Sequence, residues 1–248
     1  MSPSFRIGLC AVCLALGCDD PKPGAGGAPT AKPSAAPTPA PSAVEAPTTT
    51  SVSMDDNAVT VNGTRIAFDG PNPRSRIATE LVGKPKIAGE NVPLVAQRNA
   101  KAARVAIAVA ALKDAKAAGV VVRTQKRDNA TGELPVGWVD APVACSAVAM
   151  IAKDVSISVW TVGGVVARRF AKGMAGPDLT LGSDAFRKGA STCDSPMAYV
   201  AGDEGIQWGL VFDLALAAKE GGEGGAFRAQ KFGLVLDPPV PGRKVTPL

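Results

Sequence analysis

Histidine is absent from the 248-residue sequence. It is the commonest general base and metal ligand in proteins, so its absence removes the simplest catalytic and metal-binding arrangements. Aromatic residues are scarce, at 4%, whereas alanine and glycine are abundant. A core of such small side chains suits thin α/β layers better than a deep cofactor cavity, and we expect no cofactor. The formal charge of +5 is mild and does not by itself indicate a nucleic acid partner.

A long hydrophobic run is also missing. The apolar segment 7–17 has 11 residues, whereas a membrane-spanning helix needs about 20. Arg6 precedes this segment and small residues follow it, which is typical of a secretory signal over residues 1–17. The tetrapeptide Ala-Leu-Gly-Cys ends at Cys18 and resembles the bacterial lipoprotein signal, in which the cysteine is acylated. The alternative is ordinary cleavage near Gly17, which would release a soluble secreted protein.

The residues after Cys18 predict where the protein resides. Asp19 and Asp20 follow directly, and in some bacteria an acid there retains a lipoprotein in the inner membrane. We therefore expect a periplasmic protein anchored to the inner membrane through lipid. The segment 18–54 contains eight of the 21 prolines and almost no large apolar residue. Such a composition cannot bury a core, which predicts a disordered tether.

The cysteine count fits export. Cys10 and Cys13 leave with the signal, which leaves Cys145 and Cys193 in the mature chain. Outside the cytoplasm this pair is able to form a disulfide, and the alternative is two buried thiols that never meet. Without histidine or further cysteines, we expect no zinc site.

One pattern occurs twice after the tether, in residues 55–134 and 138–248. Apolar residues alternate around Asn62-Gly63 and again around Gly163-Gly164, which predicts a tight β-hairpin at the start of each half. A short amphipathic segment follows, at 76–82 and 183–188, with Ser183 or Asp184 as the cap of the second. Each half then continues with a strand, a longer helix and a closing strand.

The longer helices carry the clearest periodicity. Gly119 is expected to end the first one in a left-handed conformation. The two helices align without a gap at a spacing of 105 residues. Apolar residues with helical spacing are Val105, Ala108, Val109, Leu112 and Ala115 in the first, and Trp208, Val211, Phe212, Ala215 and Leu216 in the second. The sequence therefore predicts an α/β fold of the two-layer α+β type: two tandem domains, each a small mixed sheet with helices on one face.

The order hairpin–helix–strand–helix–strand resembles the periplasmic domain of the ExbD/TolR family of biopolymer-transport proteins. Two segments carry the resemblance, LVAQRNAKAARVAIAVAALKDAKAAGVVVRT at 94–124 and VAGDEGIQWGLVFDLALAA at 200–218. Like the family pattern, the second segment places an aromatic residue, Trp208, and an acid inside the helix, Asp213. The resemblance covers about residues 57–128 and 155–245. It implies a protein of the Tol/Ton type, which transduces energy across the cell envelope.

The chain departs from the family in one respect. Members that drive transport carry an N-terminal transmembrane helix with a proton-carrying acid, whereas the apolar segment 7–17 contains no acid. The resemblance thus implies a lipid-tethered, duplicated relative that binds partners of such a system without conducting protons. Since relatives of this type often pair as dimers, we expect the two copies to form an internal pseudo-dimer.

Three groups of charged residues are candidate sites. Asp203 and Glu204 precede the second long helix, where we expect them to act as a helix cap and not as catalytic acids; the matching corner of the first half carries Arg98 and Asn99. Asp213 is expected on the outer face of its helix, with contact to a partner protein as the alternative.

The third group is basic and lies at the start of the first long helix. Arg98, Lys101 and Arg104 form a candidate anion site for peptidoglycan carboxylates or lipid headgroups, and the alternative is a solubilising face.

These observations favour a non-enzymatic periplasmic lipoprotein. It would be an accessory or scaffold component of an ExbD/TolR-like transport system that binds envelope transport proteins or peptidoglycan. A structural lipoprotein of the cell wall is the first alternative, and an envelope hydrolase is the second. The hydrolase is disfavoured because no histidine and no convergent pair of acids is present.

Overall fold

The computed structural model describes residues 49–174, 176–221 and 226–248. The expected signal, Cys18 and most of the expected tether lie outside these residues. The described residues all belong to one compact unit, so the two expected domains are not separate bodies.

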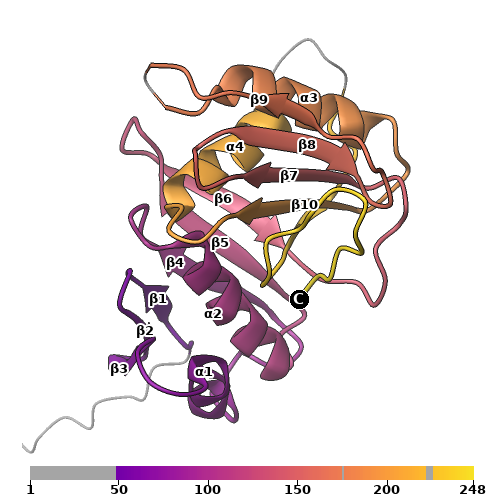
Figure 1. Ribbon diagram of the computed structural model, residues 1–248. Coiled ribbons are helices and arrows are strands. Elements are labelled where there is room, and N and C mark those ends of the chain that lie inside the picture. Colours follow the sequence, from indigo (N-terminus) through magenta and orange to yellow (C-terminus); the bar gives the residue numbers. More distant parts are fainter. Residues whose placement is uncertain (1–48, 175, 222–225) are drawn as a thin grey trace, which may run out of the picture. The chain divides into compact units, whose positions relative to one another are not determined.

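The fold is mixed α/β, as expected, and is built on one sheet of 11 strands (Figure 1). The strand order across the sheet is β3-β2-β1-β4-β5-β6-β11-β10-β7-β8-β9. The strands are β1 Val52–Met54, β2 Ala58–Val61, β3 Thr64–Ala67, β4 Asn91–Ala96, β5 Gly119–Gln125, β6 Thr131–Val136, β7 Ala147–Ile151, β8 Ile157–Thr161, β9 Arg168–Phe170, β10 Met197–Gly202 and β11 Lys231–Leu234.

In the described part of the chain, four helices cover one face of this sheet. They are α1 Pro73–Leu81, α2 Ala102–Asp114, α3 Leu179–Ser191 and α4 Trp208–Glu220. One apolar cluster joins residues of all four helices to alternate residues of the strands, such as Val92, Leu94 and Ala96 of β4. Because side chains alternate between the two faces of a strand, this cluster identifies the helical face of the sheet.

The two halves share one order of elements. The first half has the order β1-β2-β3-α1-β4-α2-β5. After β6, the second half repeats it as β7-β8-β9-α3-β10-α4-β11. The strand pairing repeats as well. Val52 of β1 pairs with Val61 of β2 and Leu94 of β4. Ala149 of β7 pairs in the same way with β8 and β10.

The expected domain boundaries need correction. β1 lies inside the segment 18–54 that was assigned to the tether, and both Val52 and Met54 are buried. β6 continues past residue 134, where the first domain was expected to end. The sheet runs through the junction because Val136 of β6 pairs with Phe232 of β11. The two expected small sheets are thus parts of a single sheet.

The turns were predicted with mixed success. Asn62 and Gly63 both have positive φ, at 48° and 86°, and form the expected tight hairpin between β2 and β3. The second hairpin is wider, because residues 162–167 separate β8 from β9. Its Gly163 has φ of 79° and lies within that loop.

Two helix-end predictions were wrong. α3 begins earlier than expected, with Asp178 as its N-cap, whose carboxylate accepts a hydrogen bond from the Leu181 amide at 3.0 Å. After α2, Lys116 takes the left-handed conformation with φ of 69°, and Gly119 begins β5.

The disulfide between Cys145 and Cys193 is present. Cys145 lies just before β7 and Cys193 lies just after α3, so the disulfide joins these two elements across a sequence separation of 48 residues. Closing a loop of that length constrains the unfolded chain by about 4 kcal/mol at most.

The opposite face of the second half carries a second apolar cluster. It includes Val148, Trp160, Met197 and Tyr199 of three neighbouring strands. The C-terminal strap, which we define as residues 237–248, crosses this face and places the buried Val245 in the same cluster (Figure 1). Tyr199, the single tyrosine of the chain, is 0% exposed there.

Tyr199 gives a direct test of this packing. Burial raises the pKa of Tyr199 to about 12, above the value near 10 of an exposed tyrosine. Because only the unfolded chain ionises readily between these values, stability should be unaffected below about pH 10 and fall above it. Absorbance at the tyrosinate band should show a transition near pH 12, or at unfolding if that comes first. Ionisation near pH 10 with native circular dichroism would contradict a buried hydroxyl, and the same titration in denaturant is the control.

Candidate functional site

The two halves meet at the starts of α2 and α4. The N-cap residues, Lys101 and Gln207, are extended and form an antiparallel β-bridge with each other. The Ala102 amide donates to the Ile206 carbonyl at 2.8 Å, and the Trp208 amide donates to the Ala100 carbonyl at 2.6 Å. A helix leaves its first amides without internal partners, and here each helix start is satisfied by the other half. We call this contact the seam.

The seam fixes how the halves correspond. Lys101 and Gln207 occupy the same place in their helices, and α2 and α4 both have 13 residues. The spacing between matching positions is therefore one residue longer than the expected 105. Glu204, not Asp203, then corresponds to Arg98.

An ion-pair cluster lies beside the seam. Arg98, from the segment between β4 and α2, donates to both carboxylate oxygens of Asp213 on α4, at 2.9 and 2.7 Å. Arg127, from the turn between β5 and β6, donates to the same carboxylate at 2.8 Å. The Asp213 side chain is 13% exposed, so its expected place on the outer face was wrong. Contact between Asp213 and another protein stays a prediction. We call Arg98, Asp213 and Arg127 the clamp.

Local contacts hold Arg98 in place. Its guanidinium also donates to the Gln125 carbonyl at 3.0 Å, and its own carbonyl accepts from the Gly209 amide at 2.8 Å. The hydrogen bond to Asp213 raises the pKa of Arg98. A Cβ at Gly209 would lie 3.1 Å from Arg98 atoms, so glycine allows this side chain to lie close to the first turn of α4.

Trp208, the aromatic residue of the family resemblance, also connects the halves. Its indole N–H donates to the hydroxyl of Thr124 on β5 at 2.8 Å, and both residues are buried. Its role in this structure is to pack the core beneath the seam.

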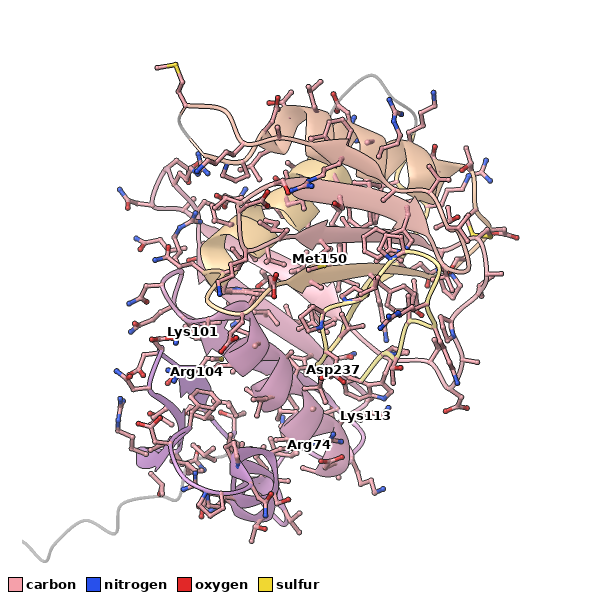
Figure 2. All side chains as sticks on the ribbon, viewed as in Figure 1. Arg74, Lys101, Arg104, Lys113, Met150 and Asp237 are labelled. Carbon is pink, nitrogen blue, oxygen red and sulfur yellow. A yellow bond between two sulfur atoms is a disulfide. The ribbon has the colours of Figure 1, made fainter. Side chains whose placement is uncertain are left out.

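The expected basic group does not converge on one site. Arg98 is held in the clamp, and Arg104 pairs with Asp56 and lies over the Phe68 ring. The Lys101 ammonium forms no ion pair with any residue in the described part of the chain. Figure 2 shows Lys101 and Arg104 near the start of α2. Anion binding by this group stays a prediction, and Lys101 is the cation that is best placed to test it.

The expected cap role of Asp203 and Glu204 was wrong. α4 begins four residues after Glu204, and its N-cap makes no side-chain hydrogen bond. Asp203 instead accepts from the Lys153 amide at 3.2 Å and from the Glu204 amide at 2.8 Å. It thus holds the corner before the seam.

Metal-ligating side chains are scattered in residues 49–174, 176–221 and 226–248: among these residues, no three of them gather closely enough to hold an ion. None of the helices in this part is long and apolar enough to cross a bilayer.

An open groove of about 890 Å³ runs beside α3. Its lining includes the apolar Phe170, Leu179 and Leu181 and the basic Arg168 and Lys188. The buried Arg187 lines it too, but its guanidinium donates to the carbonyls of Ala217 and Ala218 at the end of α4. This arrangement fits a contact surface better than a reaction centre.

Several residues of the seam and clamp were not predicted from the sequence. Arg127 belongs to a turn between β5 and β6 in which Asn129 has φ of 68°. The Asp-Asn pair at 128–129 between two apolar segments was an available turn signal. No local pattern in the sequence indicates that Arg98 contacts Asp213, because the two residues are 115 positions apart.

Comparisons of the chain with protein-family models, curated proteins and solved structures gave no match.

Removing the clamp carboxylate should weaken the joint between the halves. Asp213→Ala leaves the partly buried Arg98 without its ion pair, so the free energy of unfolding should fall by about 1–3 kcal/mol. Arg127→Ala is the matched control, because its side chain is 64% exposed and its pairing should contribute less than about 1 kcal/mol. Urea denaturation measures both. Equal, small effects of the two substitutions would show that the buried Arg98–Asp213 pair does not join the halves.

Proposed function

We propose that this chain is a non-enzymatic, lipid-anchored scaffold or accessory component of a Tol/Ton-type envelope energy-transduction system. In this proposal Ala46–Leu248 is a duplicated ExbD/TolR-like module whose two copies form an internal pseudo-dimer. The proposal places it in the periplasm, anchored to the inner membrane through Cys18. Its partners are envelope transport proteins or peptidoglycan.

The seam is the observation that carries the proposal. In a two-fold symmetric contact, residue i of one copy meets residue j of the other while j meets i. The amide-to-carbonyl bonds Ala102–Ile206 and Trp208–Ala100 have this reciprocal relation within one chain. Together with the repeated element order and strand pairing, they support an ancestral dimer that became one polypeptide.

The contacts and positions of two charged residues support a binding role. Asp213 accepts hydrogen bonds from two arginines at the joint between the halves, so its carboxylate already has partners within the chain. Lys101 presents a cation at the start of α2, where the helix dipole also favours an anion. This second observation favours the alternative of a structural lipoprotein that contacts peptidoglycan carboxylates.

Affinity purification from crosslinked membranes separates these roles. A transport role predicts recovery of motor-type inner-membrane proteins with the tagged chain, whereas the wall role predicts peptidoglycan fragments alone. Mass spectrometry of the same sample should show an acylated N-terminal cysteine. The Cys18→Ser chain is the control, and it should be released from the membrane with loss of the membrane partners. Recovery of neither class, or turnover of a cell-wall fragment by the purified chain, would contradict the proposal.

The peptidoglycan contact has its own test. Lys101→Glu should lower the fraction of chain that sediments with isolated peptidoglycan several-fold at low salt, because it replaces the attractive charge with a repulsive one. Lys219→Glu is the matched control, since Lys219 lies in the last turn of α4, at the opposite end from the seam. Equal sedimentation of the two variants would remove Lys101 from the proposed contact.

A further inference from the structure

The C-terminal strap covers a row of residues that crosses four strands. Trp160 of β8 pairs with Val148 of β7, which pairs with Tyr199 of β10, which pairs with Gly233 of β11. A Cβ at Gly233 would lie 2.4 Å from the Tyr199 ring, so the absence of a side chain lets that ring lie against the sheet. Met150, labelled in Figure 2, is a partly buried member of the same cluster.

Two hydrogen-bond donors in this row are buried and unpaired. The Trp160 indole N–H and the Tyr199 hydroxyl find no partner among the residues that the structure describes. Trp160 is 4% exposed and Tyr199 is 0% exposed. Buried polar groups are nearly always hydrogen-bonded, so two unpaired donors on one face are a feature that the fold itself does not explain.

The strap holds this face by apolar contact and few hydrogen bonds. The Gly242 amide donates to the Gly164 carbonyl at 2.9 Å, and the Leu248 amide donates to the Leu234 carbonyl at 3.2 Å. The Lys113 ammonium donates to the Leu248 carbonyl oxygen at 2.5 Å. Val245 is the strap residue that is buried in this cluster.

The strap is also rich in proline. Its sequence, DPPVPGRKVTPL, contains Pro238, Pro239, Pro241 and Pro247, and Pro239 is buried. Proline fixes φ and favours the extended polyproline conformation, which leaves backbone carbonyls free to accept hydrogen bonds.

We propose that the face formed by Trp160, Val148, Tyr199 and Gly233 binds extended, proline-rich peptide segments, and that the strap occupies it in cis. The occupant in trans is a partner's proline-rich segment that displaces the strap. The inference stands apart from the envelope role, because it depends only on the strap and the row beneath it.

The chemistry of the row fits this occupant. Aromatic side chains that combine an apolar face with an N–H or O–H donor are the common receptors of polyproline segments, whose carbonyls they bind. The strap fills the apolar part of the face but leaves both donors without acceptors. A segment that also supplies carbonyls would therefore bind better than the strap, while the strap lowers its apparent affinity by competition.

An oligoproline peptide, which offers free backbone carbonyls in the polyproline conformation and differs in sequence from the strap, is the probe. It is added to the exported Cys18→Ser chain, and binding is followed by the NMR signals of the three tryptophan indole N–H groups. The Trp160 signal should move downfield with saturation as it gains an acceptor, while those of Trp138 and Trp208 stay in place. Lys113→Met removes one tie of the strap and should raise the apparent affinity, and Val245→Ser should raise it further.

Donor removal separates binding from folding. Tyr199→Phe keeps the ring and removes an unpaired donor, so the melting temperature should not fall, while peptide affinity should fall about five- to tenfold. Trp160→Phe should lower the affinity to a similar extent. Trp138→Phe is the matched control, with no change in affinity. A lower melting temperature of Tyr199→Phe would show that its hydroxyl is already paired. Absence of a saturable shift in both the parent chain and Lys113→Met, or a dimer formed by exchange of straps, would overturn the proposal.

Discussion

The reciprocal capping of α2 and α4 is the interaction on which the arrangement of the two halves depends. Helix starts need acceptors for their first amides, and side chains usually provide them. Neither N-cap residue provides a side-chain bond here. The carbonyls of Ala100 and Ile206 do so instead, each for the helix of the other half. Separating the halves would therefore break the backbone hydrogen bonds of both helix starts together, which makes the joint cooperative.

The clamp makes this joint asymmetric. Backbone bonds alone are nearly symmetric between the halves, whereas Arg98 and Asp213 come from different halves and have no symmetric counterpart. Position 204, which matches Arg98 across the seam, carries a glutamate that makes no ion pair in the described residues. The acid lies in α4 of the second half, and the two arginines that contact it belong to the first half.

Local patterns predicted the elements, and long-range contacts decided what the sequence left open. Alternation around Asn62-Gly63 and the apolar stripes of the two long helices were sufficient to predict the repeated order and the mixed α/β class. The continuous sheet was not predictable, because the pairing of Val136 with Phe232 joins residues with no common pattern. The predicted helix cap at Asp203 and Glu204 was wrong for a related reason. Asp203 and Glu204 carry the charge that a helix start prefers, but backbone from the other half had already filled that place.

The strap had a sequence signal of a different kind. β4 shows strict alternation of exposed and buried residues, which is typical of a strand with one face in solvent. Its counterpart β10 reads MAYVAG and is buried on both faces. At the same place in the register, Pro93 of β4 is exposed and Tyr199 of β10 is fully buried. An apolar run on both faces of a strand requires a cover on each side, and only one of those covers is helical. The remaining residues after β11 are the nearest chain that is able to supply the other, so the loss of alternation in β10 and the proline-rich C-terminal segment are two parts of one constraint.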